Sequence, residues 1–488
     1  MNNIKKLLFV LPLVAAAMTG CKKEYLETQP TDNVSAETVF TTTQGAYVAL
    51  NGTYRTQFTS YNAGNFGQKS FDLVNDLMGN DMVVHTAGYG WFNTDYNYTA
   101  GASAASTQRS DRVWWHYYRV INNANRIIDG VKRATGTDAE KQDLKGQALG
   151  LRAHSYFNLI NWFQHTYKGN ENKPGVPLYT EPTTEGKPRG TVQQVYTQII
   201  ADLTEAETLL TGKTRAHISN INVNVIQGLR ARVALQMEDY ATAATYAVKA
   251  RTGFALMNST ALVGGLSSKT NTEWIWGMEV NTEQATIYNS FFSHMDVATG
   301  GYAALGGQKK ITKALYDRIP DADARKAWFT APAAATSSRP AYNQLKFRVP
   351  TVGSWAADYL FMRSSEMYLI EAEALARTGN EAGARTALEA VVKRSNPLYT
   401  AALFTGSALV NEILTQRRIE LWGEGFSYFD IKRLKQGLNR PSGTGNHGSP
   451  SFDPRVFTLA DQDASFLFRI PQDELNNNKA LTPNDQNP

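Results

Sequence analysis

Cysteine is almost absent from this chain. Cys21 is the single cysteine among 488 residues, which excludes a disulfide within the chain and any thiolate metal cluster. An excess of one charge sign is also missing. The 49 Lys and Arg against 44 Asp and Glu give a formal net charge of +5, too small and too evenly spread to indicate nucleic-acid binding. No apolar run reaches the roughly 20 residues that span a bilayer as a helix.

The common catalytic motifs are absent as well. The chain has no HExxH and no GxSxG sequence, and its seven histidines show no metal-ligand spacing. Gly443–Gly448 matches GxGxxG, but Pro441 and Pro450 flank it where a dinucleotide site needs a strand and a helix. Glu366 and Glu373 share one face of a predicted helix, where ion pairs are favoured over a glycosidase carboxylate pair.

An acidic turn leaves one further possibility open. Asp317, Asp321 and Asp323 could offer oxygen ligands to calcium, although a solvated turn is favoured for such a cluster. The sequence therefore predicts no catalytic residue, no metal site and no cofactor.

The N-terminal sequence indicates an export signal. Lys5 and Lys6 precede an apolar segment, Leu7–Met18, which is too short to remain as a membrane span. Met18-Thr19-Gly20-Cys21 resembles a bacterial lipobox, with Met where Leu is commoner; an ordinary secretory signal is the alternative. We therefore predict a signal peptide over residues 1–20, a lipid on Cys21 and a tether over 21–36.

Apolar residues with a period of 3.6 predict helices along much of the chain. The prolines of residues 165–189 indicate a loop, and alternation over 273–280 indicates a strand. Gly379 and Asn380 mark a short turn between two alanine-rich helices, which is typical of a tetratricopeptide-type hairpin. The predicted helices cover about 37–54, 111–131, 144–160, 192–210, 223–237, 239–251, 363–378 and 381–395, with a further helical segment over 407–436.

These patterns predict a mostly α fold in one domain over residues 37–488. A helical repeat scaffold covers about 111–251 and 361–436. Residues 57–108 and 254–350 are instead polar, glycine-bearing and aromatic, and long irregular insertions of this kind usually carry function.

Several ordered segments resemble one known family, the SusD/RagB nutrient-binding outer-membrane lipoproteins. The resemblance covers almost the whole chain after Cys21, and two positions depart from the family pattern: Gln416 where a Glu is usual and Ser427 where an Arg is common. The segments that carry it are Cys21–Glu27, Ala148–Leu159 (ALGLRAHSYFNL), Gly175–Leu178, Glu366–Ala374 (EMYLIEAEA), Arg417–Leu421 (RRIEL) with Glu424-Gly425, and Ile470–Leu475.

The resemblance implies a SusD-like fold, in which four tetratricopeptide-like helix pairs form a superhelical scaffold with a loop-rich irregular half packed on it. It also implies a role without catalysis. Such proteins are lipid-anchored to the outer membrane and face the cell exterior, where they capture a glycan, or sometimes a peptide, and deliver it to a SusC-type TonB-dependent transporter.

Sugars stack their C–H faces on aromatic rings, while amides and carboxylates orient their hydroxyl groups. The loop His85–Tyr98, which follows Asn80-Asp81, has this composition, and residues 284–302 form a second candidate. The predicted ligand contacts are Tyr89, Trp91, Phe92, Asn93, Asp95 and Tyr96 from the first loop, with Tyr288 and Tyr302 from the second.

Two alternatives stay open at this stage. Some loop rings could pack onto the scaffold instead of facing a ligand, and the tryptophans in helical or strand patterns, Trp114, Trp115, Trp162, Trp274, Trp276 and Trp422, are predicted to be core. The rival functions are a peptide binder on the same scaffold, a surface glycoside hydrolase and a scaffold protein that binds no small ligand.

Overall fold

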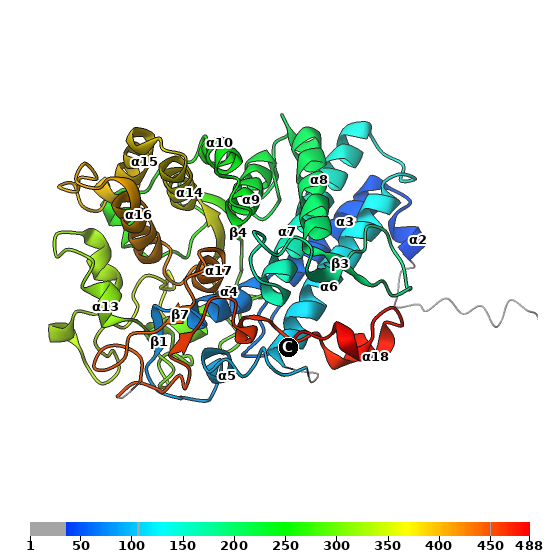
Figure 1. Cartoon of the computed structure of the whole chain (residues 1–488). Coiled ribbons are helices and arrows are strands. Elements are labelled where there is room, and N and C mark those ends of the chain that lie inside the picture. Colours follow the sequence, from blue (N-terminus) through cyan, green and yellow to red (C-terminus); the bar gives the residue numbers. More distant parts are fainter. Residues whose placement is uncertain (1–35, 105–107, 449) are drawn as a thin grey trace, which may run out of the picture.

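The computed structural model describes residues 36–104, 108–448 and 450–488 (Figure 1). Cys21, the predicted signal and nearly all of the predicted tether lie outside these residues. Long helices stand in the upper part of Figure 1, and short elements such as α5, β1 and β7 lie below them. In this described part of the chain, no helix combines the length and the apolar character needed to cross a membrane.

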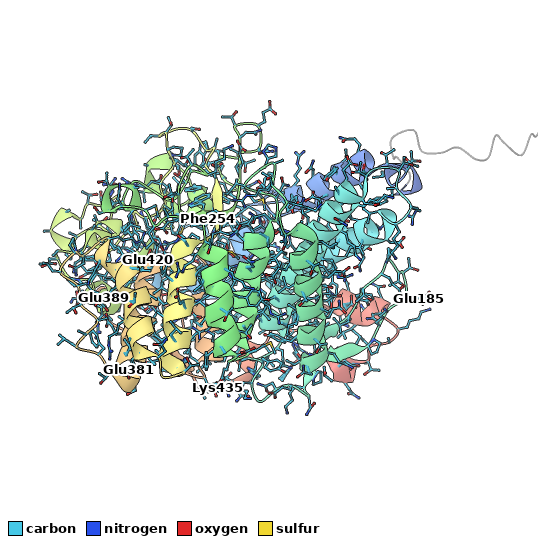
Figure 2. The ribbon with its side chains drawn as sticks, turned by 90° about the horizontal axis from the view of Figure 1, so that it is seen from above. Glu185, Phe254, Glu381, Glu389, Glu420 and Lys435 are labelled. Atoms are coloured by element: carbon cyan, nitrogen blue, oxygen red, sulfur yellow. The ribbon has the colours of Figure 1, made fainter. Side chains whose placement is uncertain are left out.

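The long helices form one row, in which each helix packs against the next. The order is α3, α6, α7, α8, α9 and α10, followed by α14, which contacts both α15 and α16. Figure 2 shows the yellow, green and cyan members of this row from above. The mostly α fold class is thereby confirmed, while the tetratricopeptide type of the pairs stays a prediction. The bounds are α3 Thr43–Thr56, α6 Arg109–Gly130, α7 Asp138–Phe163, α8 Val192–Leu210, α9 Val223–Gln236, α10 Tyr240–Arg251, α14 Ser364–Arg377, α15 Glu381–Lys393 and α16 Gly406–Glu420.

Local sequence signals set the ends of these helices. Thr137 and Thr191 each form a capping box at the start of α7 and α8, which satisfies backbone N–H groups that have no partner inside the helix. Gly379 adopts a φ of +85°, and the Asn380 side chain accepts a hydrogen bond from the Gly383 N–H at 3.1 Å. The helical hairpin predicted over 363–395 is therefore confirmed.

Two predicted elements differ from the structure. The first helix is interrupted, because Thr42 is extended and caps a new helix through the Gly45 N–H, which leaves α2 (Ala36–Val39) separate from α3. The predicted loop over 165–189 contains a strand, β2 (Pro174–Pro177), paired with β3 (Arg189–Thr191). Proline lacks an N–H donor but still fits an edge strand.

Short antiparallel ladders and short helices make up the loop-rich half. The predicted strand at 273–280 is present as β4, although all of its residues are buried instead of alternating between core and solvent. The ladders are β1 (Met82–Val84) with β5 (Lys309–Ile311), β4 (Trp274–Met278) with β6 (Tyr359–Arg363), and β7 (Leu438–Asn439) with β8 (Thr458–Leu459). The short α-helices are α4 (Gln68–Leu77), α5 (Asn93–Tyr96), α11 (Ser259–Leu262), α12 (Phe291–Met295), α13 (Lys313–Tyr316), α17 (Ser427–Arg433) and α18 (Gln472–Asn477).

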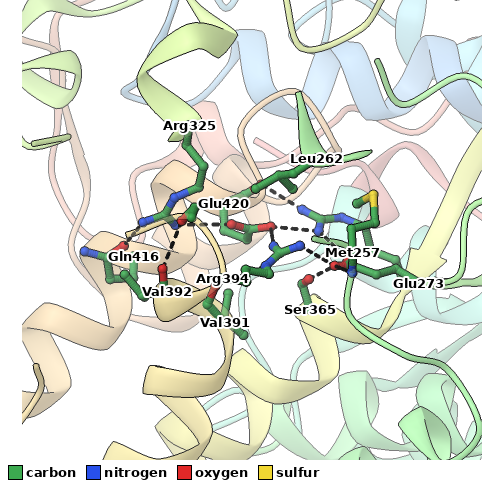
Figure 3. Close-up of polar contacts among 12 residues, drawn as sticks. Met257, Leu262, Glu273, Arg325, Ser365, Val391, Val392, Arg394, Gln416 and Glu420 are labelled. Atoms are coloured by element: carbon green, nitrogen blue, oxygen red, sulfur yellow. Dashed lines mark hydrogen bonds and ion pairs between the residues drawn. The ribbon is translucent and has the colours of Figure 1, made fainter. Parts of the chain in front are cut away.

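A buried ion network joins the loop-rich half to the helical row (Figure 3). Glu420 on α16 lies at its centre and contacts Arg325, Arg363 and Arg394. The Nη1 atom of Arg363 donates to Glu420 at 2.8 Å and to Glu273 at 2.9 Å. Burial alone would raise the pKa of Glu420, but the surrounding cations outweigh burial and hold this pKa well below its ordinary value.

The same network explains the unusual residue at position 416. Gln416 accepts a hydrogen bond from Arg325 Nη2 at 2.7 Å and donates one to Glu412 at 2.8 Å. A glutamate could not donate to Glu412, so the amide suits this position. Lys346 and Arg363 both contact Glu424, and they lower the pKa of this buried carboxyl to about 2 although burial acts in the opposite direction.

Candidate ligand-binding site

Four aromatic side chains from the two candidate loops meet at the surface, and we call Tyr89, Trp91, Tyr288 and Tyr302 the aromatic cluster. Tyr302 is central: its ring centroid lies 5.5 Å from Tyr89, 5.9 Å from Trp91 and 5.3 Å from Tyr288. Tyr89 is 68% exposed and Tyr288 is 41% exposed, while the other two rings are half-buried. The structure thus brings together four of the eight predicted ligand contacts as partly exposed rings.

A buried histidine supports the cluster from below. The His294 ring stacks on Tyr302 at 5.0 Å with an interplanar angle of 18°. Its Nε2 atom lies 2.6 Å from the carbonyl oxygen of Ala63, which assigns the proton to this nitrogen. Burial, with a smaller contribution from the charge of Lys309, lowers the pKa of His294 to about 3. The imidazole is therefore neutral at physiological pH and acts as a flat support for Tyr302.

Backbone geometry holds the first loop against the second. Gly88 has a φ of +50°, and a Cβ atom there would lie 3.2 Å from the Gly307 nitrogen. A larger residue would therefore be strained and would push the loops apart. Thr86 also donates its hydroxyl to the Gly306 carbonyl. In the β1–β5 ladder Val84 pairs with Lys309, so the rings at 89–91 and 302 meet although they are far apart in sequence.

The structure corrects three predicted contacts. Phe92, Asp95 and Tyr96 lie in the interior, with 3%, 2% and 0% of their surface exposed. Asp95 accepts two hydrogen bonds from Arg109 at 2.8 and 2.9 Å, and the Tyr96 ring stacks on His447. Such fully packed side chains hold the loop in place, so they are not among the ligand contacts that we propose below.

A small cavity lies beneath the aromatic cluster. Its volume is about 10 Å³, roughly the room that one water molecule needs. Asn93 lines this cavity: its Nδ2 atom donates to the Ala87 carbonyl at 2.9 Å, while its buried Oδ1 atom has no hydrogen-bond partner among the described residues. Lys309 lines it too, and its Nζ atom donates to the Gly307 carbonyl at 2.6 Å. The full lining is Val84, Thr86, Ala87, Tyr89, Trp91, Asn93, His294, Tyr302, Gly307 and Lys309.

A second aromatic pair was not predicted from the sequence. Tyr61 and Trp115 are 41% and 44% exposed, and their rings meet edge to face at 5.4 Å. The expectation that Trp115 belongs to the core is therefore wrong. The Ser60 hydroxyl donates to the carbonyl of Asn289, so this pair lies close to the loop that carries Tyr288.

The larger cavities lie away from the aromatic cluster. One groove of about 620 Å³ runs between α6, residues 181–186 and α18, with Trp115 and Tyr118 among its walls. Another cavity, of about 280 Å³, lies between α16 and α17, where Arg418 pairs with Asp81 and Arg417 with Asp430. We favour the aromatic cluster because partly exposed loop rings offer the flat apolar surface that a sugar ring requires.

The carboxylates considered for catalysis are engaged in ion pairs. Glu366 pairs with Arg232 at 2.7 Å, and Glu373 pairs with Arg433 at 2.7 Å and with Arg377 at 2.9 Å. Both carboxylates are buried, as predicted for ion pairs among the helices. Across the part of the chain that the structure describes, no group of three or more His, Cys, Asp or Glu side chains could hold a metal ion.

The fold is a row of helices, and its loops bring four partly exposed aromatic rings together at the surface. Residues 24–235 match a family model described as starch-binding and associating with the outer membrane, and residues 322–488 match the model of the SusD family. The chain belongs to the SusD family, as the sequence resemblance predicted.

Individual relatives agree with this assignment. A SusD-like carbohydrate binding protein from Bacteroides vulgatus is 30% identical, with 91% of this chain and 98% of that chain covered and a TM-score of 0.80. SusD-like protein P2 from Formosa agariphila is 23% identical over 98% of both chains. Surface glycan-binding protein A from Bacteroides thetaiotaomicron, solved with laminarihexaose, is 18% identical, covers 92% of this chain and all of that one, and has a TM-score of 0.72, a likeness that shows the fold alone.

Proposed function

We propose that this protein captures a glycan on the aromatic cluster and delivers it to a SusC-type TonB-dependent transporter at the outer membrane. The observation that carries the proposal is the meeting of Tyr89, Trp91 and Tyr288 around Tyr302 on two loops, with every ring partly exposed. The role is one of binding without catalysis, because the carboxylates considered for hydrolysis serve as ion-pair partners.

The chemistry of the cluster suits a sugar. A pyranose ring can lay its C–H face on a half-exposed ring such as Trp91, and this contact buries apolar surface without desolvating the hydroxyl groups. The Asn93 Oδ1 atom, for which the described part of the chain offers no donor, can accept a hydrogen bond from a group that reaches the cavity. Leaving this buried acceptor unpaired costs about 1 to 3 kcal/mol, so a ligand hydroxyl or a water there is favoured.

The comparisons support the same ligand class. One relative is described as a carbohydrate binding protein, and a structural neighbour was solved with laminarihexaose. The matching family model is described as associating with the outer membrane, which supports the proposed location. The lipobox-like sequence that ends at Cys21 supports a lipid anchor, with the binding loops facing the cell exterior.

A binding screen tests the ligand class. The protein from residue 22 onward would be run in native gels that contain single polysaccharides, and we expect retardation by at least one glycan without release of free sugar. Trp91→Ala should weaken this binding by about 1 to 3 kcal/mol, the scale of one aromatic anchor. Sugar release would indicate a hydrolase instead, and binding only to protein digests would indicate a peptide ligand.

A separate experiment tests the anchor. Cys21→Ser should leave the protein unlipidated and move it from the membrane fraction to the soluble fraction. A Cys21→Ser protein that still fractionates with membranes would contradict lipid anchoring at this residue.

A further inference from the structure

We propose that the glycan bound by this protein is anionic, bearing carboxylate or sulfate groups, and that Arg112 and Lys309 recognise its charge. The inference rests on the proposed function, because it assumes that the aromatic cluster holds the sugar. It adds a substrate class that the rings alone do not define, since they stack equally well on neutral sugars.

Arg112 lies beside the aromatic cluster. A Cβ atom on Gly64 would lie 3.2 Å from Arg112 Nη1 and 3.4 Å from the Trp91 ring, so the guanidinium and the indole lie next to the same glycine. The Arg112 side chain is half-buried on the outer face of α6. A sugar ring stacked on Trp91 would therefore have a guanidinium at its edge.

Within the described residues, the Arg112 guanidinium makes no hydrogen bond or ion pair. The carboxylate of Asp95 is already used by Arg109, which donates to both of its oxygens. Burial and the repulsion by Arg109 lower the pKa of Arg112 below its ordinary value, and they outweigh the attraction by the charges of Asp95 and Asp111. This half-buried cation thus lacks a charged or polar acceptor of the kind that Arg109 has in Asp95.

Lys309 supplies the second positive charge, from beneath the rings. Its side chain is 1% exposed, and its ammonium, which has three N–H donors, hydrogen-bonds to a single described acceptor, the Gly307 carbonyl. Burial lowers the pKa of Lys309 to about 8, so the group is still largely protonated at pH 7. No carboxylate lines the cavity that it shares with Tyr89, Trp91 and Tyr302.

Two other buried cations have more acceptors than Lys309. The Lys432 ammonium donates to three backbone carbonyls, and Arg440 donates to four. At the aromatic cluster, an anionic group of the ligand would supply the missing acceptors. The cavity holds only a water-sized group, so Lys309 would act on the ligand through one oxygen or through one bridging water.

Pairs of glycans that differ in charge test the inference. The full protein would be titrated with oligogalacturonate and with its carboxyl-reduced form, and with a sulfated galactan and its desulfated form. We expect at least one anionic member to bind about tenfold more tightly than its uncharged counterpart. This preference should weaken in about 0.5 M NaCl, because salt screens the charge of a guanidinium that is only half-buried.

Two variants and two matched controls locate the effect. Arg112→Gln should reduce affinity for the anionic glycan about tenfold, and Lys309→Met should reduce it as well. Arg126→Gln changes an exposed arginine on the same helix and should leave affinity unchanged. Lys310→Met changes the neighbouring buried lysine, whose Nζ donates to Ser451 on the other side of the strand. This variant should also leave the affinity for the anionic glycan unchanged. Thermal unfolding checks that each variant is folded. If Lys309→Met does not fold, the affinity of Arg112→Gln alone tests the inference.

The outcomes separate this inference from the proposed function. If uncharged glycans bind as tightly as anionic ones and Trp91→Ala abolishes both, the proposed function stands and the inference is overturned. If Arg112→Gln and Arg126→Gln bind the anionic glycan with the same affinity, the inference is likewise overturned. If no glycan of either kind binds, both the proposed function and the inference fail.

Discussion

Two groups of positive charge in the described part of this molecule have opposite surroundings. In the ion network, Arg325, Arg363 and Arg394 all contact Glu420, and each has a carboxylate within hydrogen-bond reach. At the aromatic cluster, Lys309 has one carbonyl acceptor and Arg112 has none in the described residues. We infer that the first set of charges stabilises the fold, whereas the second set is available to an anionic ligand.

The largest effect is expected from breaking the network at its centre. Glu420→Gln would leave three buried arginines with one carboxylate fewer and should lower the free energy of unfolding by about 3 to 5 kcal/mol. Urea unfolding of the variant and the parent protein measures this directly. The matched control is Glu185→Gln on the exposed surface (Figure 2), which should change stability by less than about 0.5 kcal/mol. Equal stability of the two variants would contradict the role of the network.

Acid should weaken the same region. The pKa values of Glu420 and Glu424 are lowered in the fold, that of Glu424 from 4.5 to about 2. A lowered carboxyl pKa contributes stability that is fully present above the unfolded value and is lost as pH falls towards the folded value. The free energy of unfolding should therefore fall between about pH 4.5 and pH 2. The loss should be smaller in Glu420→Gln, and an equal loss would assign the acid sensitivity to other groups.

The next effect distinguishes an aromatic side chain that binds ligand from one that packs in the interior. Tyr96→Ala removes a fully buried ring and should cost about 3 to 5 kcal/mol of stability. Tyr89→Ala removes a ring that is 68% exposed, so it should leave stability nearly unchanged and weaken glycan binding by about 1 to 2 kcal/mol. Thermal unfolding and calorimetric titration of both variants make the comparison. A Tyr89→Ala protein that binds normally would remove this residue from the site.

The smallest effect concerns Gln416, whose amide joins Arg325 to Glu412. Gln416→Glu would place a second carboxylate next to Glu412, which now accepts a hydrogen bond from the amide at 2.8 Å. The new attraction to Arg325 and the new repulsion from Glu412 oppose each other. We expect a net loss of about 1 kcal/mol, because a buried hydrogen bond is replaced by a contact between like charges. Urea unfolding checks this, and a gain in stability would show that the network lacks negative charge.

The helical half could be predicted from the sequence because its signals are local. Gly379 and Asn380 mark a turn within a few residues, and Thr191 lies directly before the helix that it caps. The site depends on long-range pairing instead. The β1–β5 ladder places Lys309 opposite Val84, and no spacing within either loop indicates which lysine will lie beneath which ring.

The errors at the site also have physical causes. Phe92, Asp95 and Tyr96 lie in the same aromatic loop as Tyr89, and composition alone cannot separate the side chains that pack inward from those that face solvent. The error at Trp115 was avoidable. Arg112 and Arg119 lie three residues before and four residues after Trp115, so the three side chains share one face of the helix, and the two charges indicate that this face points outward.

The most direct test of the central claim is a crystal structure with an oligosaccharide taken from a glycan that the protein retards. We expect a sugar ring stacked on Trp91 or Tyr302, with a hydrogen bond from the ligand or a bridging water to Asn93 Oδ1. A sugar bound only in the groove between α6 and α18, with the aromatic cluster bare, would contradict it.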